Sequence, residues 1–240
     1  MPQGSPSARD CTPPDGGEER FHHVEHAGRH EDADTAVALS ESVEHSHDRS
    51  ESPYSDSVTA DSLLWLNAIA FVPLALVGTL LHFGYDWSGH KRFVAVFAAV
   101  NESYWEHIKI AFWPLLLWFG VQFAIGGWMI PGFVPAATAA LYSVPVTMIA
   151  IVFGYKSLTG RNVLWIDILA FFLTIALSLA VFVLLAVEVA ASSWTIALSV
   201  FFLTLLGIAF ARFTHTPPDE PDLFIDPLNA KYGIDAHPED

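Results

Sequence analysis

The fold class follows from long uncharged runs, of which residues 163–189 are the clearest: VLWIDILAFFLTIALSLAVFVLLAVEV. Asp167 and Glu188 are the only ionisable side chains in this run. An α-helix rises about 1.5 Å per residue, so about 20 apolar residues cross a hydrocarbon core of about 30 Å. We therefore predict that residues 163–189 span a membrane as a helix.

Further apolar runs on both sides of this segment predict an all-α, polytopic transmembrane helical bundle. The expected spans are at about residues 62–83, 108–130, 133–155, 163–189 and 193–213. The short segments of alternating hydrophobicity that are typical of membrane barrels do not occur. A helical bundle is the other architecture that satisfies every backbone polar group in lipid.

The span count depends on residues 93–100, which are apolar but too short to cross a membrane alone. We expect them to form a short interfacial or re-entrant helix between the first and second spans. If they crossed together with part of the neighbouring sequence, the bundle would have six spans. Five spans are the prediction, and six are the open alternative.

Two polar tails flank the bundle, which gives three parts: residues 1–61, 62–213 and 214–240. The first tail is acidic and contains histidines, and its scattered apolar residues cannot bury enough surface to fold, so we expect disorder. It lacks the basic start and apolar core of a signal peptide. The second tail is polar and proline-rich, and its Leu223 and Phe224 either dock on the bundle or stay in solvent.

The formal net charge is −15, with 26 acidic and 11 basic residues. Such a charge argues against nucleic acid as a partner, because the phosphate backbone binds cationic surfaces. It fits a halophilic source and, equally, an ordinary acidic tail. Cys11 is the only cysteine, so an intrachain disulfide and a cysteine-based metal site are excluded. The partner that the sequence predicts is the lipid bilayer, and it indicates no particular protein partner.

Basic residues predict the orientation of a multi-pass protein in the cell membrane. In a five-span arrangement they fall in connections on one side and after the last span, whereas the connections near residues 126–132 and 190–192 carry no charge. The positive-inside rule then places the C-terminus in the cytoplasm and the N-terminal tail outside. The residues concerned are Lys91, Arg92, Lys109, Lys156, Arg161 and Arg212.

The polar stretch at residues 101–109, NESYWEHIK, stands directly against apolar sequence. Ser103 and Glu106 have the spacing of a capping box, and Asn101 is an alternative cap. Lys109 follows Glu106 by one helical turn, which suits an ion pair. In this interpretation Asn101, Ser103 and Lys109 are structural cap residues that fix where a helix enters the membrane.

A second interpretation of the same region is a metal site. His82, Asp86 and His90 are spaced by four, which would align them on one helical face, although Gly84 and Gly89 oppose a continuous helix there. Imidazole and carboxylate groups are the ligands that Zn²⁺ takes where cysteine is absent.

If the first two spans pack as neighbours, these side chains approach Glu102, Glu106 and His107, which are the candidate catalytic residues. The cofactor implied is a divalent metal such as zinc, able to activate water for a hydrolase-like reaction. No organic cofactor is implied. The candidate metal ligands are His82, Asp86, His90 and His107.

A third interpretation is a small transporter or ion-coupled protein, because ionisable groups inside a membrane mark ion pathways. Asp167 and Glu188, together with the carboxylates of the 101–109 stretch, would form the path. Both residues, however, lie near the ends of the fourth span, where ordinary interfacial positions explain them. A structural or accessory role is the function that the sequence favours over enzyme and transporter.

Three polar stretches carry a resemblance to a known family. They are LHFGYDWSG at residues 81–89, VNESYWEHIK at 100–109, and the C-terminal elements PP at 217–218, LF at 223–224, DP at 226–227 and YGI at 232–234. In this order they resemble an uncharacterised prokaryotic integral membrane family, the domain of unknown function 6512 (DUF6512), over about residues 62–235. The resemblance implies a membrane bundle and no particular activity. It favours one composite site over three unrelated helix ends.

Overall fold

Five long helices form the bundle, and each is long and apolar enough to cross a membrane. They are α2 (Pro53–His82), α4 (Tyr104–Ala124), α5 (Phe133–Thr159), α6 (Leu164–Ala186) and α7 (Ser193–His215). In α2 the candidate span is Ala60–His82. No strand occurs among the described residues, and an isolated bridge joins Ile225 and Tyr232. The predicted all-α bundle with about five spans is confirmed.

This computed structural model describes residues 53–218 and 222–237, with side chains from Ala60 on, all within one compact unit. The predicted N-terminal tail therefore lies almost wholly outside the described residues, as does Cys11. Its last residues, from Pro53 on, form the first turns of α2.

Short elements connect the long helices or follow them. They are α3 (Gly84–Trp87), η1 (Val94–Val96), η2 (Gly127–Met129), η3 (Asp222–Phe224) and η4 (Gly233–Ala236). The stretch at residues 93–100, predicted as a short interfacial helix, contains only the single 3₁₀ turn η1. The Ala99 amide donates to the Leu81 carbonyl at 3.1 Å, so this stretch folds back on the end of α2.

The helices pack through large apolar side chains and leave an apolar outer surface. The interior contains fully buried residues such as Phe112, Leu141 and Phe182. The outer faces carry Ile69 and Leu184, with 72% and 68% of their surface exposed. Apolar side chains on an outer face need a lipid environment, which agrees with a multi-pass membrane protein.

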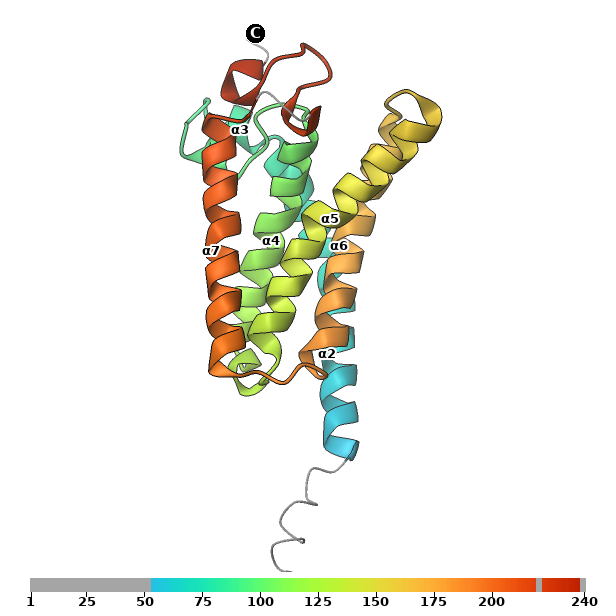
Figure 1. Ribbon diagram of the computed structural model, residues 1–240, viewed down its shortest axis with the longest axis vertical. Helices are drawn as coiled ribbons and strands as arrows, with labels where there is room; N and C mark the ends of the chain where they lie inside the picture. The colour runs from blue at the N-terminus through green and yellow to red at the C-terminus, as the bar shows by residue number, and fades with distance from the viewer. Residues whose placement is uncertain (1–52, 219–221, 238–240) are drawn as a thin grey trace, which may run out of the picture. The chain divides into compact units, whose positions relative to one another are not determined.

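We call one end of the bundle the basic end, because Lys91, Arg92, Lys156, Arg161 and Arg212 lie there. It comprises the end of α2, the connection at residues 83–103, the α5–α6 turn and the end of α7. Residues 222–237, which we call the C-terminal segment, lie over the end of α7 and the start of α4 at this end (Figure 1). The stretch at 101–109 and the C-terminal motif thus meet although more than a hundred residues separate them.

Candidate functional site

The connection at residues 83–103 turns the chain from α2 into α4. It includes two successive residues in the left-handed region, Gly89 at φ 69° and His90 at φ 62°. The indole of Trp113 donates to the Val96 carbonyl at 2.8 Å and holds the connection against α4. The helix α4 begins at Tyr104, directly after the predicted cap residue Ser103 and four residues before the predicted start of the second span, so Glu106 and Lys109 lie inside it.

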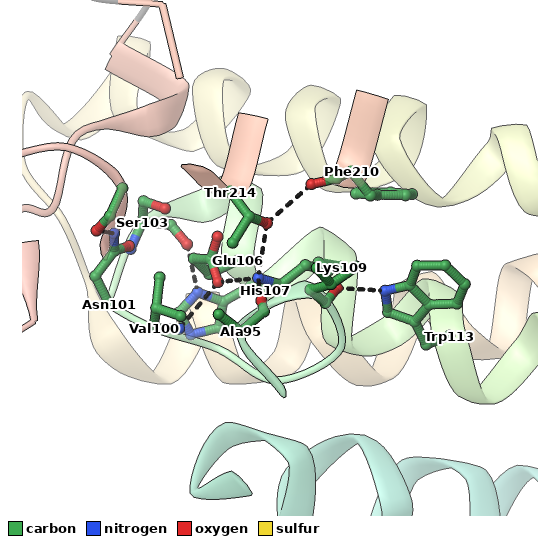
Figure 2. Close-up of polar contacts among 12 residues, drawn as sticks. Ala95, Val100, Asn101, Ser103, Glu106, His107, Lys109, Trp113, Phe210 and Thr214 are labelled. Carbon is green, nitrogen blue, oxygen red and sulfur yellow. Dashed lines mark hydrogen bonds and ion pairs between the residues drawn. The ribbon is translucent and has the colours of Figure 1, made fainter. Parts of the chain in front are cut away.

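Glu106 and Lys109 form a buried ion pair (Figure 2). Their side chains are 2% and 0% exposed, and Lys109 Nζ lies 2.5 Å from Glu106 Oε2. Nζ also donates to the Ala95 carbonyl at 2.6 Å and to Thr214 Oγ1 at 3.1 Å. The same Glu106 oxygen accepts from the Val100 amide at 2.9 Å. The pair therefore ties the connection and α7 to α4, and Glu106 is turned away from solvent.

The start of α4 is capped differently from the predicted capping box. Ser103 is at the N-cap position, but its hydroxyl makes no capping hydrogen bond. Instead Asn101 Oδ1 accepts from the Ser103 amide at 2.9 Å, and Asn101 Nδ2 donates to the Gly233 carbonyl at 2.8 Å. The Glu106 carboxylate does not complete a capping box, because it binds Lys109 and the Val100 amide instead. Asn101 thus joins the helix start to the C-terminal segment.

His82, Glu102 and His107 converge beside this pair. Glu102 Oε1 lies 3.2 Å from His82 Nε2, and Oε2 lies 3.8 Å from His107 Nε2. One ligand atom from each of the three side chains falls within 4.8 Å of the others, and all three are half-buried. The hydrogen bond from His82 lowers the pKa of the Glu102 carboxyl, the charge of the two imidazoles adds to this, and partial burial opposes it.

The orientation of His107 is set by the backbone. Its Nδ1 lies 2.9 Å from the Ser103 carbonyl oxygen. Because a carbonyl only accepts, Nδ1 carries the hydrogen and Nε2 faces Glu102. Metal-binding histidines commonly have this arrangement, in which one ring nitrogen donates to a backbone carbonyl and the other binds the metal.

A second cluster contains Asp86, His90 and His237. Asp86 Oδ1 lies 2.9 Å from His237 Nε2 and 3.5 Å from His90 Nε2. The two histidine Nε2 atoms are 3.0 Å apart. His237 comes from the C-terminal segment, directly after η4, and its Nδ1 lies 2.9 Å from the Val100 carbonyl oxygen.

Residues 58–234 match the family model described as Family of unknown function (DUF6512). The chain belongs to this family. The match includes all five candidate spans and the His82, Glu102 and His107 cluster, and it ends three residues before His237. No curated protein and no solved structure matches the chain. Membership confirms the predicted resemblance and assigns no activity.

In this DUF6512 protein the predicted site residues fall into three groups instead of one. Glu102 and His107 meet His82, whereas Asp86 and His90 meet His237. Glu106 joins neither group, because its carboxylate is held by Lys109. Sequence reasoning missed His237, and no spacing links position 237 to positions 86 and 90. The one available signal was its place just after the C-terminal family motif.

Two pockets flank Glu102 and His82 in the DUF6512 bundle. The first has a volume of about 260 Å³, and its lining includes His82 and Glu102 of the first cluster and Asp86 and His237 of the second. Its remaining wall is Phe83, Ala99, Val100, Asn101, Asp226, Leu228 and Asn229. The second, of about 310 Å³, lies between the ends of α2, α4 and α6 and includes His107. Apolar side chains such as Ile168, Phe171 and Phe172 form much of its lining.

The carboxylates proposed for an ion path do not gather at one place. Asp167 accepts a hydrogen bond from the Tyr155 hydroxyl at 2.5 Å and lines the second pocket at the basic end. Glu188 lies two residues after Ala186, the last residue of α6, at the opposite end of the bundle. The two side chains are therefore separated by the length of α6.

Proposed function

We propose that this protein is an integral membrane, metal-dependent hydrolase-like enzyme, in which His82, Glu102 and His107 bind a divalent transition-metal ion such as Zn²⁺. One observation carries the proposal: two imidazoles and a carboxylate from three separate parts of the chain bring ligand atoms within 4.8 Å of one another. Imidazole nitrogen and carboxylate oxygen are common zinc ligands.

The number of ligands supports catalysis over a purely structural ion. Structural zinc sites are closed by four protein ligands, whereas catalytic sites use three and leave a position for water or substrate. In a tetrahedral site the ligand atoms lie about 3.3 Å apart, as follows from zinc–ligand bonds of about 2.0–2.1 Å. The Glu102 carboxylate oxygens lie 3.2 Å from His82 Nε2 and 3.8 Å from His107 Nε2, close to this spacing.

The proposed reaction is the hydrolysis of an ester or amide. A divalent ion held by His82, Glu102 and His107 would supply a bound water that loses a proton readily and can attack a carbonyl carbon. The water oxygen would form the new bond to that carbon, the bond to the leaving oxygen or nitrogen would break, and a proton from the water would pass to the leaving group. The first pocket supplies a water-accessible approach, because it opens beside Glu102 and His82.

The second pocket supports an amphiphilic substrate. It reaches from Glu102 and His107 along Ile168, Phe171 and Phe172 between helices that face lipid. An acyl chain in this pocket would gain from burial against those side chains. Its polar end would then lie beside the Glu102 carboxylate, where the two pockets meet.

The transporter hypothesis has less support from these residues. An ion path needs polar groups that reach the middle of the membrane. The second pocket touches Glu102 and Asp167, but along α6 it extends only from Leu164 to Phe172, less than half of that helix. The structural role that the sequence favoured is best supported at Glu106 and Lys109, beside the proposed metal ligands.

We also propose that the basic end faces the cytoplasm of a cell membrane. Its exposed or half-buried cations are Lys91, Arg92, Lys156, Arg161, Arg212 and, in the C-terminal segment, Lys231. The positive-inside rule supports this orientation, which places the proposed site and the C-terminal segment on the cytoplasmic side.

Metal analysis tests the proposal. Full-length protein purified in detergent from zinc-supplemented cells is compared with His82→Ala, with His107→Ala, and with His215→Ala, which removes an exposed imidazole at the same end of the bundle. We expect both site variants to lose one equivalent of zinc and the control to lose none. Equal zinc in all four proteins would refute the site.

The catalytic part has a separate test. The same proteins are assayed with 4-nitrophenyl acetate and 4-nitrophenyl laurate, which differ in chain length. We expect zinc-dependent cleavage that favours the laurate and is lost in His82→Ala. If zinc binds at His82 and His107 but the wild-type protein cleaves neither ester faster than His82→Ala does, the ion has another role and the hydrolase-like assignment is wrong.

A further inference from the structure

We infer that Asp86, His90 and His237 form a second divalent-cation site, which fastens the C-terminal segment to the connection after α2. The ligand class is a borderline transition metal such as Zn²⁺, Co²⁺ or Ni²⁺, because two imidazoles and one carboxylate make up the donor set. The inference stands on different residues from the proposed function and does not depend on it.

The spacing of the three donor atoms is the first argument. The separations are 2.9 Å and 3.5 Å from Asp86 Oδ1 to the two imidazoles, and 3.0 Å between His90 Nε2 and His237 Nε2. Ligand atoms around a tetrahedral zinc ion are about 3.3 Å apart for bonds of about 2.0–2.1 Å. The cluster already has the dimensions of one face of such a tetrahedron.

The hydrogen-bonding state of His237 is the second argument. Its Nδ1 lies 2.9 Å from the Val100 carbonyl oxygen, so Nδ1 carries a hydrogen. In the neutral ring the lone pair is then on Nε2, which faces the Asp86 carboxylate and the His90 ring nitrogen. A metal ion among these three atoms would bind the lone pair and neutralise the carboxylate together, whereas a shared proton would bridge only two of them. The Val100 carbonyl orients His237 as outer-shell acceptors orient metal-binding histidines.

The backbone at His90 is the third argument. His90 has φ 62°, in the left-handed region that residues with a Cβ rarely adopt. Gly89 precedes it at φ 69°. This pair of positive φ values reverses the chain after α3 and brings the His90 ring to 4.5 Å from the His237 ring, measured between centroids. A disfavoured backbone conformation thus places a donor atom in the cluster.

An ion at this position would link the end of the chain to its first connection. His237 is far in sequence from Asp86 and His90, so the link closes a long loop, and closing a long loop stabilises the closed state most. The C-terminal segment also contributes Asp226, Leu228, Asn229 and His237 to the wall of the first pocket. Metal binding here would therefore keep that wall in place beside Glu102.

Cobalt titration and hydrogen exchange test the inference on full-length, metal-stripped protein in detergent. The background is His82→Ala, which removes the first proposed site. Three further substitutions are each added to this background. His90→Ala keeps the His237 contact with Val100, and Asp86→Asn keeps the size of the side chain. His215→Ala is the control. Histidines of residues 1–52 are present in every variant, so their binding cancels in the comparison.

We expect Co²⁺ to bind the His82→Ala protein with a visible spectrum of tetrahedral cobalt and to slow amide exchange in residues 222–237. Loss of an outer-shell partner costs ~10–100-fold in metal affinity, and loss of a direct ligand should cost at least as much. Both site variants should show that weakening and no change in exchange on adding Co²⁺, whereas His215→Ala should match its parent.

Two results would overturn the inference. One is Co²⁺ affinity that His90→Ala and Asp86→Asn leave unchanged. The other is exchange in residues 222–237 that does not respond to Co²⁺ in the His82→Ala protein, which would mean that protons alone hold the three side chains together. Either result leaves the His82, Glu102 and His107 site untouched, and failure of that site leaves this one untouched.

Discussion

Lys109 shows how a charged side chain is accommodated inside a membrane helix. Its ammonium has three donors, and Glu106, the Ala95 carbonyl and Thr214 provide three acceptors (Figure 2). Burying one charge without a partner costs several kcal/mol, whereas a paired and hydrogen-bonded charge costs far less. The pair is therefore stable only as a unit.

The first prediction concerns this pair. Lys109→Met leaves the Glu106 carboxylate buried without its counter-charge and should lower the free energy of unfolding by about 3–5 kcal/mol. The double variant Glu106→Gln with Lys109→Met should recover much of this loss, because the amide oxygen still accepts from Val100. Reversible unfolding in detergent mixtures measures both. A single variant within about 1 kcal/mol of wild type would contradict the argument.

Residues 106 and 107 also show which contacts of the site could not be predicted from the sequence. Both were candidate catalytic residues because packing of the first two spans as neighbours would bring them towards His82, Asp86 and His90. In the structure Glu106 faces Lys109 and His107 faces Glu102. Neighbours on a helix point about 100° apart, so they serve different clusters. The helical face could be predicted, but the partners on each face come from other elements.

At the scale of elements, the crossing of α2 and α4 depends on a glycine. A Cβ on Gly78 would lie 2.7 Å from Phe171 Cζ and 2.9 Å from the Ile110 carbonyl oxygen. The carbonyl belongs to the backbone of α4 and cannot rotate away. Close approach of α2 to α4 is what brings His82 beside His107, so this packing positions the candidate site.

The second prediction follows from that contact. Gly78→Ala should destabilise the bundle by about 1–3 kcal/mol through overpacking. Gly120→Ala is the matched control, since Gly120 is inside α4 and nothing lies within 4 Å of a Cβ there. Alanine in a helix interior is favoured over glycine by about 0.5–1 kcal/mol, so the control should be neutral or more stable. Thermal unfolding of both proteins gives the comparison, and equal effects would rule out the close contact.

The third prediction concerns the C-terminal segment, whose docking depends on apolar burial as well as on polar contacts. Phe224 is 5% exposed, and its ring centroid lies 5.1 Å from that of Trp105. Phe224→Ala should lower the free energy of local opening by about 3–5 kcal/mol. Leu228→Ala is the control, since Leu228 is 78% exposed in the same segment.

Limited proteolysis of metal-free protein is the measurement. Each 1.4 kcal/mol or so changes an opening equilibrium about tenfold, so cleavage within residues 222–237 should accelerate by two orders of magnitude or more in Phe224→Ala. Leu228→Ala should be cleaved at the wild-type rate. If both variants behave alike, the segment is not held by its apolar contacts.

The elements themselves were predictable because each span carries its own signal. Apolar length alone identified five helices, and the predicted third span began at the residue where α5 begins. The second span was placed at residues 108–130 and is found at Tyr104–Ala124. Hydropathy counts Glu106 as a charge and so excluded it from the span, whereas in the fold Lys109 neutralises it within the helix. The contacts between position 237 and positions 86 and 90 correspond to no periodic pattern in the sequence, so they could not be predicted from it.

For the whole molecule, the distribution of tryptophans and of basic residues defines two different ends. Exposed tryptophans lie at both ends, with Trp128 and Trp194 at one and Trp87 and Trp165 at the other. Such belts mark the levels of the two headgroup regions. If all five candidate spans cross the membrane, residues 60 and 215 lie on its opposite sides.

The last prediction is the orientation of that bundle. The positive-inside rule places the basic end in the cytoplasm, so Ser157 should face the cytoplasm and Ser193 the outside. Both serines are exposed and lie at opposite ends of the bundle. Each is replaced by cysteine in a Cys11→Ser background, and intact cells are treated with a membrane-impermeant maleimide. Ser193→Cys should react at once, and Ser157→Cys only after permeabilisation. The reverse pattern would place both proposed metal sites outside the cell, where the metals available to them differ from those in the cytoplasm.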